Sequence, residues 1–530
     1  MSVGKTIKDY FKEHKLKTCL IVLAIAAVTV LSLLPAQILR IIVDDVIKEE
    51  KAQRLLAAAL IYAGTYILIG IVTFLKDLIM LSASQSVTMK LRGNMMKHVH
   101  QMSYKELVNT DSGTLEAYFN NDVNSINELF TSGVVNMTTD LFKMIGIVIS
   151  IFIYSAVFGG IVLALLPILL AFTSFVRKRM LKAQLKTKSL EGNVNKSLLE
   201  NVENIEQIKV NKAEEYASHK YISILQSHFR VSQASNFYDA MFSPVMQIIR
   251  NLVVCGVLLV SGYNSSVFGL SIGMIISAIT LLTDLFTPIE NLGMEIQTIQ
   301  KSVAAVKRIN EFFKLTADDP KTEEVPKGST VVLKNVSFAY ENKPVIEDFS
   351  LTIQPGEKIA LQGPSGVGKS TLLKLMMGLL KPTGGEVTIG GVSSYALADE
   401  AKRKLFSIVY QDPFFSGGTI YEEITLKNNE ISREEVLESL RAVGLEYIQD
   451  IDIILNDKEY SSGELSLFNI ARVIVQKPEI IFLDEMNAKL DSLTGKQIIS
   501  LINQFSKDKI VISINHYGDI LENAKIIRMG

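Results

Sequence analysis

The sequence has few cysteines and almost no net charge. Only two cysteines occur in 530 residues, and the formal net charge is −1 at pH 7. Cys19 and Cys255 both lie in apolar runs and form no metal-ligand spacing, so we expect neither a disulfide framework nor a zinc site. A balanced charge also gives no general electrostatic reason to bind nucleic acid.

Apolar residues, in contrast, are abundant. Hydrophobic residues make up 48% of the chain, and the mean hydropathy is +0.27 although 21% of the residues are charged. The excess lies before residue 300, which predicts a membrane half followed by a soluble half. A bilayer-spanning helix needs ~20 mostly apolar residues. The stretches that qualify are roughly 18–43, 56–80, 133–157, 159–176, 245–262 and 269–288.

The basic residues set the expected orientation of these spans. Lysines precede the first span, and Lys or Arg residues lie between the second and third spans and after the fourth, whereas the short turns after the third and fifth spans carry none. The positive-inside rule therefore places both termini in the cytoplasm. No small-residue cleavage site follows the first apolar run, so we interpret it as a span and not as a removable signal peptide.

The long connections on the cytoplasmic side have helical patterns. Residues 177–235 contain no proline and have apolar positions at helical spacing, as do 82–108 and 289–314, so we expect the spans to continue as helices beyond the membrane. Breaks at 111–113 (DSG) and 201–204 (NVEN) predict a short transverse element at the far tip of each connection. Solvated connectors are the alternative interpretation.

Several charges fall within the apolar spans. Charged side chains at membrane depth usually face a protein interior or an aqueous cavity, which makes Arg250 and Asp284 candidates for a substrate path. For Arg250, Asp140 and Lys143 the alternative is that they reach the inner interface by snorkelling.

The second half reads as a soluble α/β domain. Residues 315–329 are polar with two prolines and predict a linker. Strand-like runs at Val331–Val336, Lys358–Leu361, Ile408–Tyr410, Ile480–Leu483 and Ile510–Ile514 alternate with helical segments, which predicts a mainly parallel sheet. The chain thus divides into residues 1–314, a linker at 315–329, and a domain at 330–530.

A phosphate-binding loop lies near the start of this domain. Residues 363–371 read GPSGVGKST and fit the pattern G-x-x-x-x-G-K-[ST], between a β-prone run and a helix-forming run. Glycines let several backbone N–H groups point inward and hold a polyphosphate. We expect Lys369 to reach the β- and γ-phosphates and Ser370 to bind Mg²⁺. The expected ATP-binding residues of the loop are Gly363, Pro364, Ser365, Gly366, Val367, Gly368, Lys369, Ser370 and Thr371.

Five further residues complete the expected nucleotide chemistry. The run PEIIFLDE predicts a buried strand with Asp484 at its edge for Mg²⁺, followed by Glu485 to orient or deprotonate the attacking water. Gln411 can reach Mg²⁺ or the water, and His516 can contact the γ-phosphate. Taken singly, a Gln and a His at strand ends are more often structural. Tyr340, ahead of the loop, can stack on adenine.

Together these residues resemble the ATP-binding cassette (ABC) transporter superfamily, and in particular exporter-type half-transporters. The resemblance covers nearly the whole chain. It implies an α-helical membrane domain of six long transmembrane helices followed by an α/β P-loop NTPase domain of ABC type, in a bacterial cytoplasmic membrane. In family terms GPSGVGKST is the Walker A motif, Tyr340 the adenine-stacking residue, Gln411 the Q-loop, Asp484 and Glu485 the end of Walker B, Asp491 the D-loop, and His516 the switch histidine. Residues 110–123 and 200–215 resemble the two coupling segments.

The sequence departs from the family pattern at the signature, which in the family is LSGGQ and closes over ATP held by the other cassette. Here it reads Tyr460-Ser461-Ser462-Gly463-Glu464. Ser462 adds a side chain where glycine permits close approach, and Glu464 adds negative charge near a polyphosphate, so both weaken that closure. The family's usual C-terminal helices do not follow His516 before Gly530, and no protease segment precedes the first span, so we expect no leader-peptide cleavage by this chain.

We therefore expect an ATP-driven exporter that works as half of a heterodimer with one degenerate ATP site. ATP and Mg²⁺ are the expected cofactors, a second half-transporter the expected partner, and an amphipathic drug, lipid or peptide the expected cargo. Two alternatives stay open, a homodimeric exporter and an ATP-gated regulatory subunit that transports nothing. Glu485 speaks against the latter, because a pure gate needs no water-activating carboxylate.

Overall fold

The structure is a computed structural model, and it describes residues 2–47, 52–263, 271–319, 321, 323–340, 343–410, 413–484, 492–514 and 523–529. The chain forms two compact units. The first unit comprises Met1–His100 and Thr110–Leu315, and the second comprises Gln101–Asn109 and Thr316–Gly530. A short segment from the first half of the chain thus belongs to the second unit.

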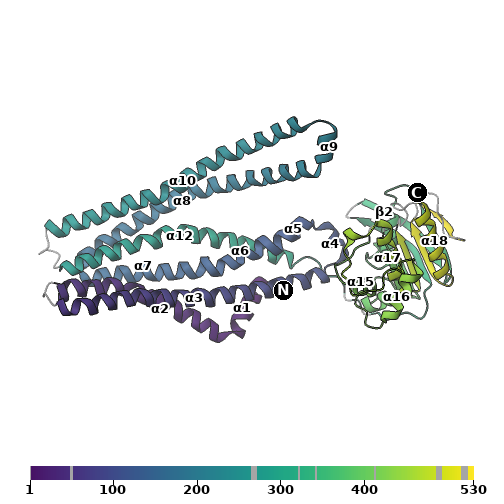
Figure 1. Cartoon of the computed structure of the whole chain (residues 1–530), viewed down its shortest axis with the longest axis horizontal. Helices are drawn as coiled ribbons and strands as arrows, with labels where there is room; N and C mark the ends of the chain where they lie inside the picture. The colour runs from purple at the N-terminus through teal and green to yellow at the C-terminus, as the bar shows by residue number, and fades with distance from the viewer. Residues whose placement is uncertain are drawn as a thin grey trace. The chain divides into compact units, whose positions relative to one another are not determined.

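The first unit is entirely helical in its described part (Figure 1). Its helices are α1 (Val3–Glu13), α2 (Lys15–Ile41), α3 (Ala52–Gln101), α5 (Ser112–Ala117), α6 (Val123–Glu128), α7 (Val134–Tyr154), α8 (Ala156–Glu203), α9 (Ile205–Val210), α10 (Glu214–Tyr263) and α12 (Ile272–Phe312). Wider π-helical turns at Ile42–Ile47, Tyr118–Asp122 and Leu129–Gly133 continue some of these helices.

Six helical segments in the described chain are long and apolar enough to cross a membrane, which confirms the six spans. They are Lys15–Ile47, Arg54–Gln101, Ser112–Tyr154, Ala156–Glu203, Glu214–Leu259 and Ile272–Phe312. At 33 to 48 residues each, they exceed the ~20 that a bilayer requires. The expected continuation beyond the membrane is therefore confirmed, and the short helix α9 follows the break at Asn204, between α8 and α10.

Helix α12 packs at the centre of this unit. Half of its apolar window is buried (50%), against 6% for that of α3. Leu281, Leu285 and Phe286 of α12 join Ile147 and Ile151 of α7 in one apolar core. Within it, the Tyr154 hydroxyl lies 2.6 Å from Gln37 Oε1 and 2.8 Å from Ser277 Oγ, which satisfies these polar groups inside an apolar bundle.

The second unit contains two sheets. One is antiparallel, with the order β2-β1-β4-β5, and the other parallel, with the order β6-β7-β8-β3-β9. The strands are β1 (Val331–Tyr340), β2 (Lys343–Ile353), β3 (Lys358–Gln362), β4 (Gly384–Ile389), β5 (Val392–Ser393), β6 (Phe406–Val409), β7 (Ile480–Asp484), β8 (Ile510–Ile514) and β9 (Lys525–Arg528). The helices are α4 (Tyr104–Asn109), α13 (Lys369–Met376), α14 (Asp399–Leu405), α15 (Ile420–Thr425), α16 (Arg433–Ala442), α17 (Ser462–Gln476) and α18 (Ser492–Phe505), with a 3₁₀ turn at Asp457–Glu459.

One strand assignment needs correction. The run Val331–Val336 is a strand, but it does not join the parallel sheet: β1 pairs antiparallel with both β2 and β4. Tyr340 pairs with Lys343, so β1 and β2 form a hairpin, and a tight connection of this kind can only join antiparallel strands.

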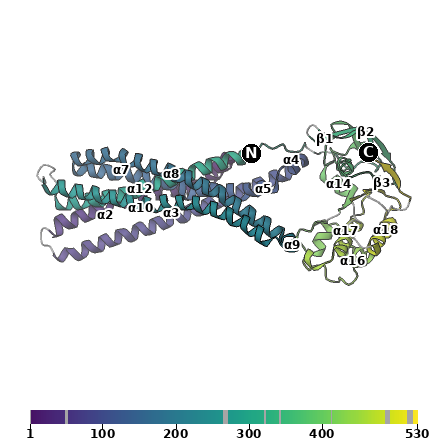
Figure 2. The ribbon, with the colours of Figure 1, turned by 90° about the horizontal axis from the view of Figure 1, so that it is seen from above.

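Two apolar cores divide this unit. One joins the two sheets to α13, and the other joins α15, α16 and α17 to one face of the parallel sheet. Figure 2 shows α16 and α17 at the other end of the unit from β1 and β2. The phosphate loop and the signature segment therefore rest on different cores of one domain.

The segment Gln101–Asn109 packs on the second unit. Met102 forms a β-bridge with Ala317, and the Asp318 N–H donates to the Gln101 carbonyl over 2.8 Å. The Lys374 ammonium of α13 lies 5.5 Å from the centre of the Tyr104 ring, a cation–π distance. This segment directly precedes residues 110–123, which we expected as the first coupling segment.

The polar residues after Thr316 are also held on this domain. Asp318 accepts a hydrogen bond from the Tyr395 hydroxyl and pairs with Lys321 over 2.7 Å. Close by, the buried Lys402 donates to the Gly378 carbonyl over 2.9 Å. Burial, followed by the neighbouring Lys321, lowers the pKa of Lys402 to about 8.

The depressed pKa of Lys402 predicts a pH dependence of local stability. Between about pH 8 and about pH 10 the unfolded chain binds a proton at this lysine that the folded chain has lost, so stability rises with pH in this window. Hydrogen–deuterium exchange in residues 375–405 of the full chain, corrected for the intrinsic exchange rate, should show protection increasing over this range. Lys402→Met should abolish the increase, whereas Lys381→Met, at a surface ion pair with Asp319, should retain it. The same slope in wild type and Lys402→Met would contradict the prediction.

Candidate active site

The phosphate loop connects β3 to α13. Strand β3 lies between β8 and β9 and is parallel to both, so its carboxyl end is fixed from two sides. Helix α13 is anchored by Leu372, Leu375 and Met376, which are fully buried and spaced three and four residues apart on one face. The loop is thus held between a central strand and a core-packed helix, as the sequence predicts.

Two glycines of the loop are required by its geometry. Gly368 is the N-cap of α13 with φ +103°, and a Cβ there would lie 3.0 Å from Val345 Cγ1. A Cβ on Gly363 would lie 2.3 Å from the Met529 carbonyl oxygen. Any side chain at either position would therefore displace the neighbouring chain.

Lys369 lies over the loop that precedes it. Its Nζ donates to the carbonyl oxygens of Gly363 over 2.8 Å and Pro364 over 3.0 Å, and the side chain is buried. Ser370 follows in the first turn of α13 and is exposed. A buried ammonium beside the positive N-terminus of a helix is suited to bind a polyphosphate.

Asp484 lies at the same sheet edge as the phosphate loop. In the strand register, Ile514 of β8 is aligned with Asp484 on one side and with Leu361 on the other. Asp484 is thus two strands, about 10 Å, from the end of β3. Carboxyl ends of parallel strands form the ligand-binding edge of such sheets. The register therefore brings the expected Mg²⁺ ligand and the phosphate loop together.

Four expected site residues lie outside the described residues: Gln411, Glu485, Asp491 and His516. Their roles stay predictions. Tyr340 ends β1, and its ring contacts Phe338 edge-on at 4.9 Å between centroids. Arg250 on α10 and Asp284 on α12 are both half-buried in the first unit, and their role in a substrate path also stays a prediction.

The signature segment forms the N-terminus of α17. Ser461 is the N-cap, and its Oγ accepts from the Glu464 N–H over 3.2 Å. In return Glu464 Oε2 accepts from the Ser461 N–H over 2.9 Å and from its hydroxyl over 2.8 Å. This is a capping box, in which serine and glutamate satisfy each other's backbone N–H groups.

A residue outside the motif holds the other oxygen of Glu464. The Tyr447 hydroxyl donates to Glu464 Oε1 over 2.5 Å. This bond, followed by the bonds from Ser461, lowers the pKa of Glu464, while burial raises the pKa of Tyr447 to about 12. The glutamate is therefore charged and Tyr447 protonated at neutral pH. Nothing in the sequence pattern singled out Tyr447.

A buried ion pair connects α17 with α15 and the segment after Gln411. Arg472 Nε donates to the Glu423 carbonyl over 2.9 Å, and its Nη2 lies 3.5 Å from Glu423 Oε2. Glu423 Oε1 accepts in turn from the N–H groups of Ser416 and Gly418 over 2.8 and 2.9 Å. This network cannot be found from the sequence, because Arg472 and Glu423 are far apart in the chain and only packing brings them together.

Family models match both halves of the chain. Residues 18–289 match the ABC transporter transmembrane region, and residues 346–488 match the ABC transporter model for the ATP-binding domain.

Curated relatives align over most of the chain. The exp8 protein of Streptococcus pneumoniae, described as an ABC transporter ATP-binding protein, is 24% identical over 539 residues, 99% of this chain and 92% of that protein. YheH of Bacillus subtilis, described as a multidrug resistance ABC transporter ATP-binding/permease protein, is 26% identical over 84% of this chain and 68% of its own length. An ATP-dependent lipid A-core flippase of Syntrophus aciditrophicus is 23% identical over 91% of this chain and 82% of that protein.

A solved structure has the same fold. The structure of a bacterial Atm1-family ABC exporter with ATP bound matches with a TM-score of 0.78 at 22% identity, covering 98% of this chain and 94% of that chain.

A six-span membrane domain fused to a phosphate-loop domain defines the class of the protein, an ATP-driven membrane transporter. The chain belongs to the ABC transporter family, as an exporter that binds ATP and couples its hydrolysis to transport. It carries one membrane domain and one ATP-binding domain, the content of half a dimeric exporter, and it is a multi-pass membrane protein.

The first prediction from the site concerns Lys369. Removing its ammonium in Lys369→Ala should weaken ATP binding about 10- to 100-fold, because a charge-assisted hydrogen bond contributes ~1.5–3 kcal/mol. Binding of a fluorescent ATP analogue to the purified full chain measures the effect. Lys381→Ala, which removes a surface lysine, should bind normally. Unchanged affinity in Lys369→Ala would show that the ammonium does not contact the nucleotide.

The second prediction concerns the buried Arg472–Glu423 pair. Arg472→Ala leaves the Glu423 carboxylate buried without its cation, so we expect a loss of about 3–5 kcal/mol in the stability of the ATP-binding domain. The matched control is Arg433→Ala, which breaks an exposed pair with Asp452 and should lower stability by no more than about 1 kcal/mol. Denaturant unfolding of the full chain in detergent compares the two variants. Equal losses of unfolding free energy in the two variants would contradict the expectation that the buried Arg472–Glu423 pair matters more than the exposed pair.

Proposed function

We propose that this chain is one half of a heterodimeric exporter with one competent and one degenerate ATP site. The observation that carries the proposal is the closed hydrogen-bond arrangement of Ser461, Glu464 and Tyr447 at the N-terminus of α17. In the family this segment closes over ATP held by the other half, so its chemistry decides the fate of the partner's nucleotide.

The first consequence concerns Ser461. A hydroxyl has one proton to donate, and that of Ser461 is donated to Glu464 Oε2. A γ-phosphate is a pure acceptor at neutral pH, so it would have to displace this bond before it could bind the hydroxyl. The Ser461 hydroxyl is therefore already hydrogen-bonded within its own helix and is not available to a phosphate.

The second consequence concerns charge. The free N-terminus of a helix behaves as roughly +0.5 elementary charge and attracts anions. Here the Glu464 carboxylate already lies at that N-terminus, stabilised in its charged form. An approaching phosphate would meet a like charge, which opposes closure by on the order of 1–3 kcal/mol at ~5 Å and an effective dielectric of ~20 or more. Ser462, exposed in the first helical turn, adds a side chain on the same approach.

The other site would use this chain's own nucleotide-binding residues. In the proposal, Lys369 and the loop N–H groups hold the β- and γ-phosphates, and Ser370, Gln411 and Asp484 hold Mg²⁺. Glu485 activates the attacking water, His516 contacts the γ-phosphate, and Tyr340 stacks on adenine. An intact signature from a different half-transporter would complete this site, with Asp491 at the interface.

The proposed cargo is amphipathic and crosses the cytoplasmic membrane outward, with both termini of this chain in the cytoplasm. The relatives named for multidrug resistance and for lipid A-core flipping support a cargo of this kind. Arg250 and Asp284 are the proposed polar residues of the path. A homodimeric exporter is the alternative, and the arrangement around Glu464 argues against it because both sites would then be impaired.

Neutralising the signature should rescue the second site. We expect the double variant Ser462→Gly with Glu464→Gln to raise ATP turnover of the native pair at that site about tenfold, which corresponds to ~1.4 kcal/mol. Glutamine can still accept the N-cap hydrogen bond, so the helix cap survives while the charge is lost. Single-turnover hydrolysis by this chain paired with a candidate half-transporter, the pair meant here by the native pair, measures the rates at the two sites.

A matched control comes from a second capping box in the same domain. Ser432 and Glu435 form the same arrangement at α16, so Glu435→Gln should leave the turnover unchanged. Equal hydrolysis rates at the two sites of the wild-type pair, or brisk turnover by this chain alone that Glu485→Gln abolishes, would refute the heterodimer and favour a homodimeric exporter.

A further inference from the structure

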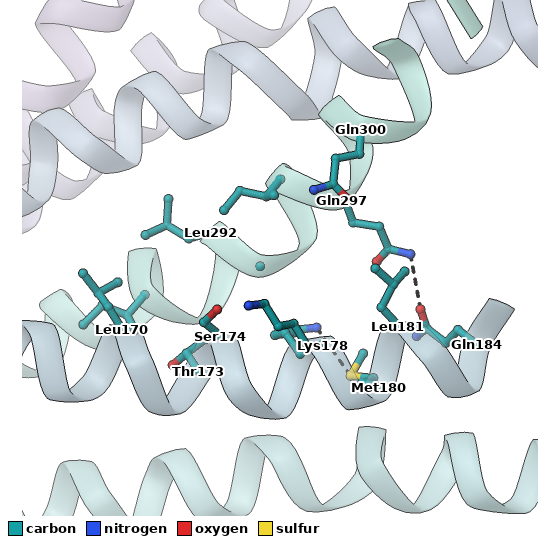
Figure 3. A pocket seen from close by; sticks show the side chains of 14 residues that line it. Leu170, Thr173, Ser174, Lys178, Met180, Leu181, Gln184, Leu292, Gln297 and Gln300 are labelled. Atoms are coloured by element: carbon teal, nitrogen blue, oxygen red, sulfur yellow. Dashed lines mark hydrogen bonds between the residues drawn. The ribbon is translucent and has the colours of Figure 1, made fainter. Parts of the chain in front are cut away.

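A cavity in the first unit lies outside the nucleotide site. It has a volume of about 330 Å³ and lies between α8 and α12 (Figure 3). Leucines line it from both helices, and its basic and glutamine residues follow residue 176 on α8 and residue 296 on α12, whereas the two hydroxyl residues Thr173 and Ser174 lie nearer its other end. Figure 3 shows Leu170, Leu181 and Leu292 together with Lys178, Gln184 and Gln297 around this space.

The cavity lies where the apolar part of α8 ends. Residues 156–176 contain no charged residue, and Arg177, Lys178 and Arg179 follow directly. Basic residues at the end of a span mark the boundary between hydrocarbon and water on the cytoplasmic side. One end of the cavity thus faces hydrocarbon depth and the other the headgroup region.

Arg177 is built into the wall of the cavity. Its guanidinium lies 4.2 Å from the centre of the Phe242 ring, and its Nη2 donates to the Glu290 carbonyl oxygen over 3.0 Å. A Cβ on Gly293 would lie 2.7 Å from Arg177 Cγ, so the glycine makes the close passage of this side chain past α12 possible. The guanidinium is positioned by packing from two other helices.

The charge of Arg177 is not neutralised locally. Its Nε is buried without a hydrogen-bond partner, and among the described residues no carboxylate pairs with Arg177 or Lys178. Asp239 and Glu290 act on Arg177 only from a longer distance. A buried donor without a partner is unfavourable by ~1–3 kcal/mol, and more for a charged group, so an anionic group close to the guanidinium would stabilise its charge.

We propose that this cavity binds an amphipathic anion, with its carboxylate or phosphate head at Arg177 and Lys178 and its apolar tail toward Leu170. A cationic amphiphile would be repelled by the two basic residues, and a neutral one would leave them unneutralised. Two sources share this chemistry, a bilayer lipid of the inner leaflet and an exported amphiphile. The second source rests on the proposed export function.

The sequence offers a direct way to test binding. It contains no tryptophan, so Leu170→Trp places a single fluorescent reporter in the cavity wall, on the hydrocarbon side of Arg177 where the tail is expected. The full chain with this substitution is reconstituted in nanodiscs, and quenching is recorded with a dibrominated fatty acid and with dibrominated phosphatidylglycerol or phosphatidylcholine. We expect both anionic probes to quench more strongly than brominated phosphatidylcholine. Equal quenching by all three would overturn the proposal.

Charge variants in the Leu170→Trp background locate the head. Lys178 is exposed, so Lys178→Gln should preserve the fold and weaken binding of the fatty acid about five- to tenfold. Arg177→Gln should weaken it at least as much. Because Arg177 also packs on Phe242, the parallel Lys178 variant separates the loss of charge from the loss of packing. Lys182→Gln, one turn further along α8 and outside the lining, is the matched control and should bind as the parent does. Unchanged affinity in Lys178→Gln and Arg177→Gln would overturn the assignment.

A second measurement distinguishes a bilayer lipid from an exported amphiphile, and it tests the binding site separately from the export proposal. Quenching requires no ATP, so it reports on the cavity even if the export proposal fails. In proteoliposomes containing the native pair, MgATP should accelerate movement of the fatty acid across the bilayer if the anion is cargo. Charge-selective quenching without such movement assigns the cavity to a bilayer lipid and counts against fatty-acid export, while the binding site itself stands.

Discussion

The hydrogen-bond register of the parallel sheet is the constraint on which the nucleotide site depends. Because β8 pairs with β7 on one side and with β3 on the other, Ile514 aligns both Asp484 and Leu361 to one edge. A slip of one residue would turn Asp484 to the other face of its strand. The side chains of β7 and β8 are nearly all apolar and buried, and both faces of the sheet are covered, so these strands lie in its interior. The strand pairing thus sets the position of the phosphate loop relative to Asp484.

The same domain is held to the chain that leads into it by a second set of contacts. The bridge of Met102 with Ala317 and the stacking of Lys374 on Tyr104 attach the segment after α3 to the domain that carries the loop. Lys374 lies on α13, the helix that begins at Lys369. Residues 101–109, which directly precede the expected coupling segment at 110–123, thus contact the helix that follows the phosphate loop.

How far the sequence predicts the structure depends on whether a feature is local. The spans, the strand β3, the loop and the strand of Asp484 were all predicted, since each rests on a contiguous pattern of apolar residues or glycines. β1 was placed in the wrong sheet, because alternation shows a strand but not its partner. Tyr447, Arg472 and Arg177 were missed as functional candidates for the same reason, since each acquires its meaning from contacts with residues that are distant in the chain. The sequence analysis identified Glu464 as a departure but could not show that its carboxylate is directed back at its own helix.

The signature shows how a stable local structure can oppose a function in the assembled protein. A glutamate at the third position of a helix is among the best partners for an N-cap serine, and Tyr447 stabilises it further in this chain. A glutamine at the same position could satisfy the same backbone group without the charge. In the isolated domain, glutamate at this position stabilises the fold more than glutamine would, because a carboxylate interacts favourably with the helix N-terminus. In an ATP site where that N-terminus must bind a phosphate, the Glu464 carboxylate competes with the phosphate for the same N–H groups and the same positive charge. The stronger the cap in the separated half, the less the helix can offer to a nucleotide held by its partner, so the asymmetry that we propose between the two ATP sites would follow from the energetics of one helix end.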